Sequence, residues 1–283
     1  MSCLQVRGLS ASCSVLALPA VWVHLTFKRN MDMTAREDLR ETGTKTRQRL
    51  GLPVRKHQSS MPGLPNLVSE VVFGRVWSRP GLALDERMLA TLSALTSKQY
   101  LPQLGTYLHA ALSMDMSPRM LQEVMLHCAM YAGIPTAQNS LAVLDSVLEE
   151  NGITVDAETL PEVDLDEMEA MGRETMRALH AERADAGYAA PDSAASELYA
   201  TAIQYLYGEI WNRPGISRRQ RMICSVAAFT ANQMETQQKK FFRSAQNVGL
   251  TRTEIMEIIT QTGPYSGFPT ALNALTVAEQ VLD

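Results

Sequence analysis

The sequence has 283 residues, 46% of them hydrophobic, and a formal net charge of -4 at pH 7. This length and apolar content can bury one large core or two ordinary ones. The small net charge and the scattered Lys and Arg residues give no reason to expect a nucleic-acid partner. Aromatic residues make up only 6%, and the abundance of Leu, Ala and Met favours helices over sheets.

The N-terminal segment contains the one candidate for export or membrane insertion. Its apolar run, residues 9–25, is broken by Pro19 and His24 and is shorter than the ~20 residues that a spanning helix needs. A signal peptide with Arg7 in its n-region is an alternative, although no convincing cleavage site follows. We interpret residues 1–30 as a doubtful extension, with translation starting at Met31 or Met33, and expect no membrane partner.

Cysteine usage indicates a reducing compartment. The four cysteines are Cys3, Cys13, Cys128 and Cys224. They form no Cys-x-x-Cys pair, which argues against a disulfide framework and against a zinc ribbon. We therefore expect a cytoplasmic protein, in which Cys128 and Cys224 behave as small apolar residues.

Two stretches of the chain recur in the same register. Residues 123–139 and 257–273 share a Glu, a Tyr eight positions on, a Gly ten positions on, and then Pro-Thr-Ala and Asn. The motif Trp-x-Arg-Pro-Gly at 77–81 recurs at 211–215. One spacing of about 134 residues superposes both echoes, which predicts a tandem duplication.

The predicted boundaries follow from this duplication. We assign residues 31–150 to a first domain with its own leading helix, residues 151–195 to a linker and the leading helix of the second unit, and residues 196–283 to the second domain. Below, the first unit means residues 31–150 and the second unit means residues 151–283. Aligning Gly43 with Gly172 also aligns Thr46 with Thr175 in the two leading helices.

Apolar spacing of three and four residues predicts the same series of helices in each unit. The helices expected in the first unit are 34–50, 68–76, 84–95, 101–113, 117–133 and a last one from 135 through 147. Those expected in the second unit are 164–183, 198–210, 218–229, 235–247, 251–267 and a last one from 269 through 281. Proline-containing connectors are expected at 52–65 and 186–196.

Capping residues and prolines support the predicted ends of these helices. Ser117 and Thr251 are hydroxyl N-caps, and Glu254 completes a capping box with Thr251. The Pro in each Trp-x-Arg-Pro-Gly turn disfavours helix in the residue before it. No apolar alternation of period two has a useful length, so the sequence predicts an all-α protein.

Three motifs together resemble the carboxymuconolactone decarboxylase family, which has the all-helical AhpD-like fold. They are the Trp-x-Arg-Pro-Gly-Leu turn, the helix that ends in Leu-His109, and the stretch Glu-Val-x-Leu-His-x-Ala-x-Tyr-Ala-Gly-Ile-Pro from Glu123. The resemblance covers residues 64–282, twice over, and implies two tandem AhpD-like domains. Single-unit relatives form trimers or hexamers, so it also implies a homo-oligomer, here a trimer of two-domain chains.

The resemblance argues against one activity of the family. Its thiol peroxidases carry Cys-x-x-Cys followed by His, but counting back from His109 the cysteine positions hold Gly105 and Pro102. The second unit holds Lys239 and Thr236 there. Peroxidase chemistry needs a thiolate and a resolving thiol, so we expect none.

The other activity is removal of CO2 from a carboxylated lactone in aromatic catabolism, without metal or organic cofactor. By resemblance, His109 and His127 fall on the histidine positions of that branch, and we expect them to be catalytic. The second unit has Arg243 and Gln261 there, and the Glu that often precedes the first His by four residues is replaced by Gly105. The implied substrate is a small carboxylate or lactone that resembles 4-carboxymuconolactone.

Decarboxylation without a cofactor needs a cation to anchor the substrate, donors for delocalised charge, and an acid to protonate carbon. The histidines suit the acid role because an imidazole titrates near neutral pH. Arg87 and Arg221 could hold a carboxylate through a bidentate fork, with Tyr131 and Arg243 as further substrate-binding candidates. The alternatives are an ion pair across the unit or oligomer interface for the two arginines, and a packed ring for Tyr131.

Glu123 lies four residues before His127, on the same helix face. Because Glu recurs at 257 where His127 has become Gln261, we assign Glu123 and Glu257 an orienting or structural role. A Glu-His pair is half a metal site, but no third ligand has a suggestive spacing, so we expect no metal. We interpret His57 and His180 as solvated.

Two further functions remain open at this point. The chain could be a non-catalytic ligand-binding or assembly protein, which Gly105 and the altered second unit favour. It could also be a cofactor-free isomerase or cyclase that uses the same histidines. The alternative to catalysis for each His is a packed, hydrogen-bonded side chain between helices.

Overall fold

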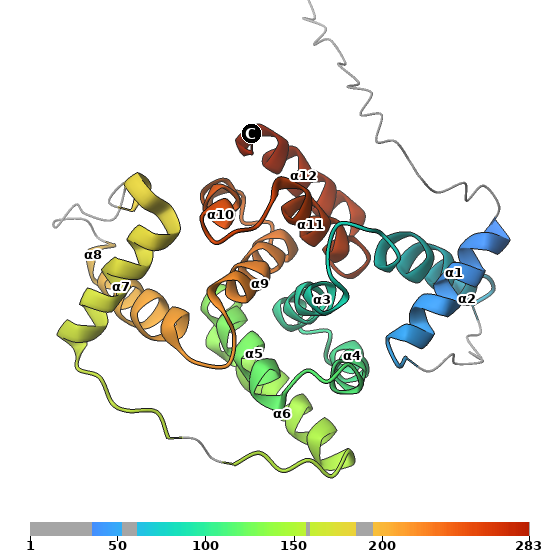
Figure 1. Ribbon diagram of the computed structural model, residues 1–283, viewed down its shortest axis with the longest axis horizontal. Coiled ribbons are helices and arrows are strands. Elements are labelled where there is room, and N and C mark those ends of the chain that lie inside the picture. The colour runs from blue at the N-terminus through green and yellow to red at the C-terminus, as the bar shows by residue number, and fades with distance from the viewer. Residues whose placement is uncertain (1–35, 53–60, 157–158, 185–194, 283) are drawn as a thin grey trace, which may run out of the picture. The chain divides into compact units, whose positions relative to one another are not determined.

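The computed structural model describes residues 36–52, 61–156, 159–184 and 195–282 (Figure 1). These residues form helices joined by turns and contain no strand, which confirms the all-α prediction. Among them, no helix combines the length and the apolar character that a membrane span requires. The predictions for residues 1–30 and for His57 lie outside the described residues.

The two units have the same series of helices, close to the predicted bounds. The first unit contains α1 (Arg36–Arg49), α2 (Leu64–Leu67), the π-helix Val68–Trp77, α3 (Leu84–Lys98), α4 (Leu101–Ser113), α5 (Pro118–Ala132) and α6 (Ile134–Glu150). The second contains α7 (Leu165–His180), the short 3-10 helix Ala181–Arg183, α8 (Ser196–Thr201), the π-helix Ala202–Glu209, the 3-10 turn Ile210–Asn212, α9 (Arg218–Ala231), α10 (Glu235–Asn247), α11 (Arg252–Ser266) and α12 (Phe268–Val281).

The caps confirm how α5 and α11 begin and end. Ser117 accepts a hydrogen bond from the Met120 amide, and Thr251 and Glu254 form the predicted capping box. Both helices stop at a glycine in the left-handed region, with φ of 103° at Gly133 and 98° at Gly267. Glycine adopts this conformation without the steric penalty of a side chain, so the chain turns sharply into α6 and α12.

Each leading helix crosses the π-helix of its own unit through glycines. A Cβ atom on Gly43 would overlap the Ser69 carbonyl oxygen, and one on Gly74 would overlap the Leu39 carbonyl oxygen. Gly172 and Gly208 make the same close approach in the second unit. The sequence predicted both helix pairs but gave no reason for these glycines, whose role is to let two backbones touch.

The centre of the described chain is the pair α3 and α9, one helix from each unit (Figure 1). Helix α5 of the first unit packs on α9, and α11 of the second unit packs on α3. Buried apolar residues of both units belong to one continuous hydrophobic core. The duplicated halves are therefore interlocked.

Candidate functional site

Two buried carboxylates bind arginines of the opposite unit. Glu123, on α5, accepts hydrogen bonds from Arg221 Nη2 at 2.9 Å and from Arg213 Nε at 3.0 Å. Arg119, one helical turn earlier, lies 3.0 Å from the same carboxylate. The side chains of Glu123 and Arg221 are 1% and 0% exposed, so this is an ion pair inside the core.

The same arrangement occurs on the other side. Glu257, on α11, accepts from Arg87 Nη2 at 2.8 Å and from Arg79 Nη2 at 2.5 Å. Arg79 and Arg213 come from the two Trp-x-Arg-Pro-Gly turns. Sequence reasoning offered an ion pair for Arg87 and Arg221 but did not name the partner glutamates, although one signal was available: each unit repeats one carboxylate and two arginines at the same spacing.

These contacts bear on the two interpretations of Arg87 and Arg221. Both guanidinium groups are buried and donate to a glutamate of the other unit, and Arg221 Nη1 has no hydrogen-bond partner among the described residues. The interface alternative is therefore the one that the structure shows. Glu123 and Glu257 hold arginines between the units, which is a structural role. Within the described part of the chain, no hydrogen bond joins Glu123 to His127.

His127 lies fully buried between α5 and α9. Its Nε2 is 2.9 Å from Ser225 Oγ and 3.4 Å from the Tyr131 hydroxyl, and Ser225 Oγ is 3.1 Å from that hydroxyl. Its ring meets the Trp211 ring edge to face, with centroids 5.0 Å apart. Three polar side chains from both units thus converge on one point, and Tyr131 is part of that cluster.

In the second unit, the position equivalent to His127 is occupied by a glutamine on α11. Gln261 stands at the position of His127; its Oε1 accepts from Arg87 Nη1 at 3.1 Å and its Nε2 donates to Thr91 at 3.0 Å. Around His127, by contrast, His127 Nδ1 and Arg221 Nη1 are buried and have no hydrogen-bond partner among the residues that the structure describes. Buried polar atoms nearly always have hydrogen-bond partners. The surroundings of His127 can therefore offer hydrogen bonds to a bound group, and the surroundings of Gln261 lack this capacity.

The protonation of His127 follows from its surroundings. Burial and the nearby positive charge of Arg221 hold the pKa of His127 well below its usual 6.5, so the free imidazole is neutral at pH 7. Ser225 donates its proton to the Arg221 carbonyl at 2.9 Å. With that bond made, the imidazole donates Nε2–H to Ser225, and a lone pair remains on Nδ1.

Aromatic rings close the site on the side of the second unit. The Tyr131 ring contacts Phe229 at 4.6 Å and Phe241 at 6.4 Å between centroids. Burial raises the pKa of Tyr131 above its usual value, so its hydroxyl stays protonated. The cluster is therefore a buried, mostly apolar environment with a few polar atoms, which is the composition typical of small-molecule sites.

The two other predicted residues lie elsewhere. His109, on α4, is partly exposed, and its ring nitrogens are 3.1 Å from Glu150 and 3.1 Å from Asn151. Arg243, on α10, is exposed and donates to the Val281 carbonyl at 3.3 Å. The described contacts of His109 and His127 share no residue, so this structure does not bring the two predicted catalytic histidines together.

The interpretation of His180 as a solvated residue is wrong. Its side chain is fully buried, because α7 packs with this face against α10 and against the π-helix Ala202–Glu209. Its Nδ1 is 2.7 Å from Ser244 Oγ and its Nε2 is 3.1 Å from the Tyr207 hydroxyl. The helical spacing around it was visible in the sequence, but the partner helix was not.

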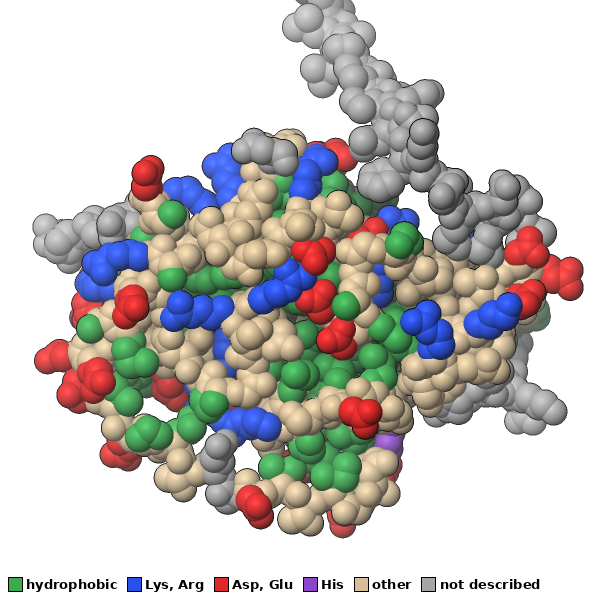
Figure 2. Space-filling model, in the orientation of Figure 1, with side chains coloured by type: hydrophobic (Ala, Val, Ile, Leu, Met, Phe, Trp, Pro, Cys, Tyr) green, Lys and Arg blue, Asp and Glu red, His purple; other side chains and the backbone are tan. Residues whose placement is uncertain are grey.

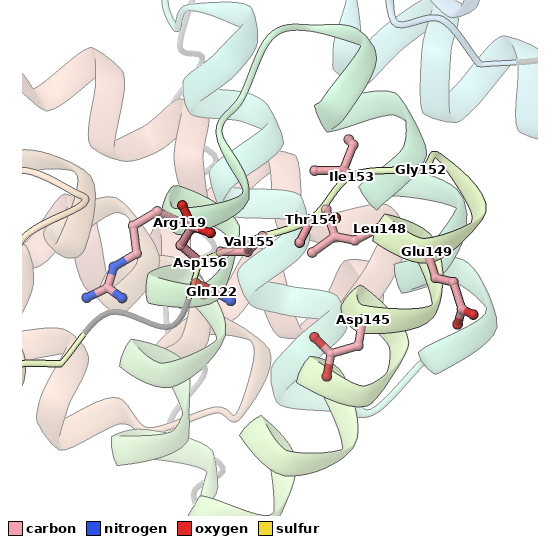
Figure 3. A pocket seen from close by; sticks show the side chains of 10 residues that line it. All are labelled: Arg119, Gln122, Asp145, Leu148, Glu149, Gly152, Ile153, Thr154, Val155 and Asp156. Carbon is pink, nitrogen blue, oxygen red and sulfur yellow. The ribbon is translucent and has the colours of Figure 1, made fainter.

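A surface pocket of about 630 Å³ lies between α5, α6 and the segment that follows α6 (Figure 3). Its charged lining side chains are Arg119, Asp145, Glu149 and Asp156. Three carboxylates against one guanidinium disfavour a carboxylate ligand there. Among the described residues, no group of three or more His, Cys, Asp and Glu side chains is placed to hold a metal ion.

Comparison with known proteins identifies several that are similar in sequence to this chain. Over 88 residues it is 33% identical to the 4-carboxymuconolactone decarboxylase of Acinetobacter baylyi, a match covering 31% of this chain and 66% of that protein. Over 84 residues it is 29% identical to the nitrosuccinic acid decarboxylase npaB of Metarhizium robertsii, covering 30% and 59%. An uncharacterized 15.0 kDa protein of Paracoccus denitrificans is 30% identical over 99 residues, covering 34% and 74%.

The chain thus spans less than two thirds of the length of each of the two named decarboxylases. The sequence model of the carboxymuconolactone decarboxylase family matches twice, at residues 62–146 and 196–280. These two matches coincide with the two helical units and confirm the predicted tandem repeat. The chain belongs to the carboxymuconolactone decarboxylase family.

Proposed function

We propose that the protein is a cofactor-independent decarboxylase of a small carboxylated substrate, with its chemistry at His127. One observation carries this proposal: His127 Nδ1 and Arg221 Nη1 are buried without a hydrogen-bond partner among the described residues, while Gln261 fills the equivalent place. A carboxylate is the group that a guanidinium and an imidazole bind best. The relatives named as decarboxylases support the reaction class.

The proposed reaction divides the work among three side chains. Arg221 faces the substrate anion, the carbon–carbon bond to the carboxylate breaks, and CO2 leaves. The bonding electron pair passes to a carbonyl conjugated with that carbon, where Ser225 and Tyr131 are the nearest hydroxyl groups to His127. A proton then adds to the carbon and completes the product.

His127 supplies that proton in this scheme. The free imidazole is neutral because burial and Arg221 lower its pKa. An anion bound beside an imidazole favours the charged form and raises its pKa. Substrate binding therefore favours protonation of His127, and this proton is later transferred to the carbon.

The substrate, pathway and assembly belong to the proposal as well. We propose a substrate of the 4-carboxymuconolactone or nitrosuccinic acid type, a cytoplasmic location, and a homo-oligomer. Ile134 and Phe268, 65% and 52% exposed at equivalent positions of the two units, support an interface between copies. Light scattering after size-exclusion chromatography tests the proposed trimer.

The complete burial of His127 favours one second candidate, a non-catalytic protein in which His127 only ties α5 to α9. The test is mass-resolved turnover of 4-carboxymuconolactone, generated in situ, and of nitrosuccinic acid. Loss of the mass of CO2 in the product supports the decarboxylase, and no turnover by the folded protein with either acid supports the second candidate. A His109→Ala variant in the same assay tests whether the exposed histidine takes part.

A further inference from the structure

A smaller cavity lies in the second unit, beside α10, α12 and the turn that joins α9 to α10. Its volume is about 320 Å³, at the lower end of the ~300–1,000 Å³ that is usual for small-molecule sites. Most of the side chains that line it are carboxamides or hydroxyl groups, namely Gln233, Gln238, Asn273, Gln280, Thr270 and Thr276. In Figure 2, the surface over α10 and α12 is largely tan, the colour of uncharged polar side chains and of backbone.

The first unit makes the same helix contact with side chains that bond one another. Helix α4 packs on α6 as α10 packs on α12. There, Asn139 Nδ2 donates to Gln99 Oε1 at 2.8 Å, and Gln99 Nε2 donates to the Thr136 carbonyl at 3.1 Å. At the position of Gln238 the first unit has Leu104, which is completely buried. Packing of the two helices therefore does not require the polar lining found in the second unit.

In the second unit, the corresponding side chains leave hydrogen-bonding groups free at the cavity. Gln233 Nε2 donates to Thr270 Oγ1 at 3.3 Å, and no hydrogen bond joins Gln233 to Asn273 in the part of the chain that the structure describes. Gln238 is only 3% exposed, and its Nε2 donates to the Phe229 carbonyl at 3.0 Å. Its Oε1 has no partner within the described residues, so this buried side chain presents an unpaired oxygen to the cavity that it lines. Buried polar groups nearly always have a partner.

The charges and rings at the cavity limit the kind of ligand. No Lys or Arg is among the described lining residues, so a carboxylate or a phosphate would have no counter-charge there. The one carboxylate among them, Glu235, already pairs with Lys239 at 2.5 Å, which argues against an organic cation. The described lining also contains no aromatic ring to stack on a flat base. A neutral ligand that both donates and accepts hydrogen bonds is left.

Hydroxyl groups match this set of side chains. Each hydroxyl donates one hydrogen bond and accepts two, so it can donate to Gln238 Oε1 and accept from the amides of Asn273 and Gln280. We propose that the cavity binds a small neutral polyhydroxy compound, either a cyclic sugar or an open-chain sugar alcohol. Gln238 is its specificity-determining contact, because it is the buried carboxamide of the set. The lining shares no residue with the His127 cluster, so this inference does not rest on the proposed function.

The experiment measures binding to the whole protein by ligand-observed saturation-transfer NMR, with D-glucose and sorbitol as probes and acetamide as a separate arm. Thermal unfolding is not used, because polyols stabilise proteins generally by exclusion from their surface. Gln238→Leu installs the residue of the first unit and removes the unpaired oxygen. Gln246→Leu is the matched control: Gln246 is an exposed residue of the same helix outside the cavity lining, and it also corresponds to a leucine of the first unit, Leu112.

We expect saturable binding of glucose or sorbitol by the wild type. The Kd should rise about tenfold in Gln238→Leu, because the hydrogen bond to the buried oxygen is lost. Gln246→Leu should bind like the wild type. The probe that binds more tightly shows whether the ligand is cyclic or open-chain.

Other results would overturn the inference. No saturable binding of either polyol by the wild type, or the same Kd for the wild type and Gln238→Leu, overturns the site. Saturable binding of acetamide but of neither polyol overturns the polyhydroxy assignment. If Gln238→Leu does not fold, Gln280→Ser decides by the same criterion, because it installs Ser146 of the first unit at an exposed position of α12.

Discussion

Arg221 Nη2 lies 2.9 Å from Glu123 Oε2, and these two buried side chains belong to different units of the duplicated chain. Arg87 and Glu257 repeat the contact in the opposite sense at 2.8 Å. Each unit therefore contributes one carboxylate and one guanidinium to the other. The same contact places Arg221 beside His127, so the bond that joins the units also shapes the candidate site.

Removing one partner of this buried pair is expected to be costly. Glu123→Gln leaves Arg221 buried without its counter-charge, and we expect the free energy of unfolding to fall by about 3–5 kcal/mol. Urea unfolding measures this change. Glu41→Gln, which breaks the exposed pair of Glu41 with Lys45, is the control and should change stability far less. Similar effects of the two substitutions would show that the buried pair is not a strong link.

Two glycine substitutions are expected to change the free energy of unfolding in opposite directions, because Gly43 lies at the close crossing of α1 and its π-helix and Gly105 does not. Gly43→Ala pushes a Cβ atom into the Ser69 carbonyl oxygen and should cost about 1–3 kcal/mol or more. Gly105→Ala, inside α4, meets only Val143 Cγ1 at 3.4 Å and should stabilise the helix by about 0.5–1 kcal/mol. Thermal and urea unfolding of the two variants measure the sign of each effect, and a stabilising Gly43→Ala would contradict the crossing.

Buried His180 predicts a loss of stability in acid. Its pKa is about 3 in the folded protein against 6.5 as the ordinary value, so below pH 6.5 the unfolded chain binds a proton that the folded chain does not. Stability from this group is complete above pH 6.5 and falls towards pH 3, by up to about 1.4 kcal/mol per pH unit. Buried His127 acts in the same direction.

Urea unfolding at several pH values between neutral and about 5 checks this slope. His180→Gln should make the slope shallower, whatever its effect at neutral pH. Identical slopes for the wild type and His180→Gln would contradict the assignment of a neutral buried imidazole.

The proposed proton loading of His127 predicts a pH dependence of catalysis. In the free protein His127 is neutral through the physiological range, and substrate binding takes up one proton. The value of kcat/KM should therefore fall about tenfold per pH unit as pH rises through neutrality. A plateau of kcat/KM from about pH 5 to about pH 8 would mean that no proton is taken up with the substrate.

The helices were predictable because their signals are local. The Ser117 cap, the Thr251–Glu254 capping box and the glycines at 133 and 267 depend on residues a few positions apart. Because the chain is duplicated, the same pattern of helices could be recognised twice, once in each unit. The π-helical turns were not predicted, and neither was the close packing of Gly43 and Gly172 against the backbones of these turns.

The site was less predictable, since its contacts join distant residues. His127 could be selected by its resemblance to the family, but its partner Ser225 lies 98 positions away in the sequence. Arg87 pairs with Glu257, which is 170 positions away. Nothing local to Arg221 distinguishes a substrate anchor from an arginine that holds a glutamate of the other unit. His180 was misjudged for the same reason, because its burial depends on α10.

The most direct test of the account compares CO2 release by the wild type, His127→Gln and Gln261→His, each confirmed to be folded. His127→Gln installs the residue that satisfies the arginine in the other half, and Gln261→His is the reciprocal change. The account predicts that the wild type and Gln261→His convert 4-carboxymuconolactone or nitrosuccinic acid with loss of CO2, while His127→Gln does not. Undiminished CO2 release by His127→Gln would contradict it.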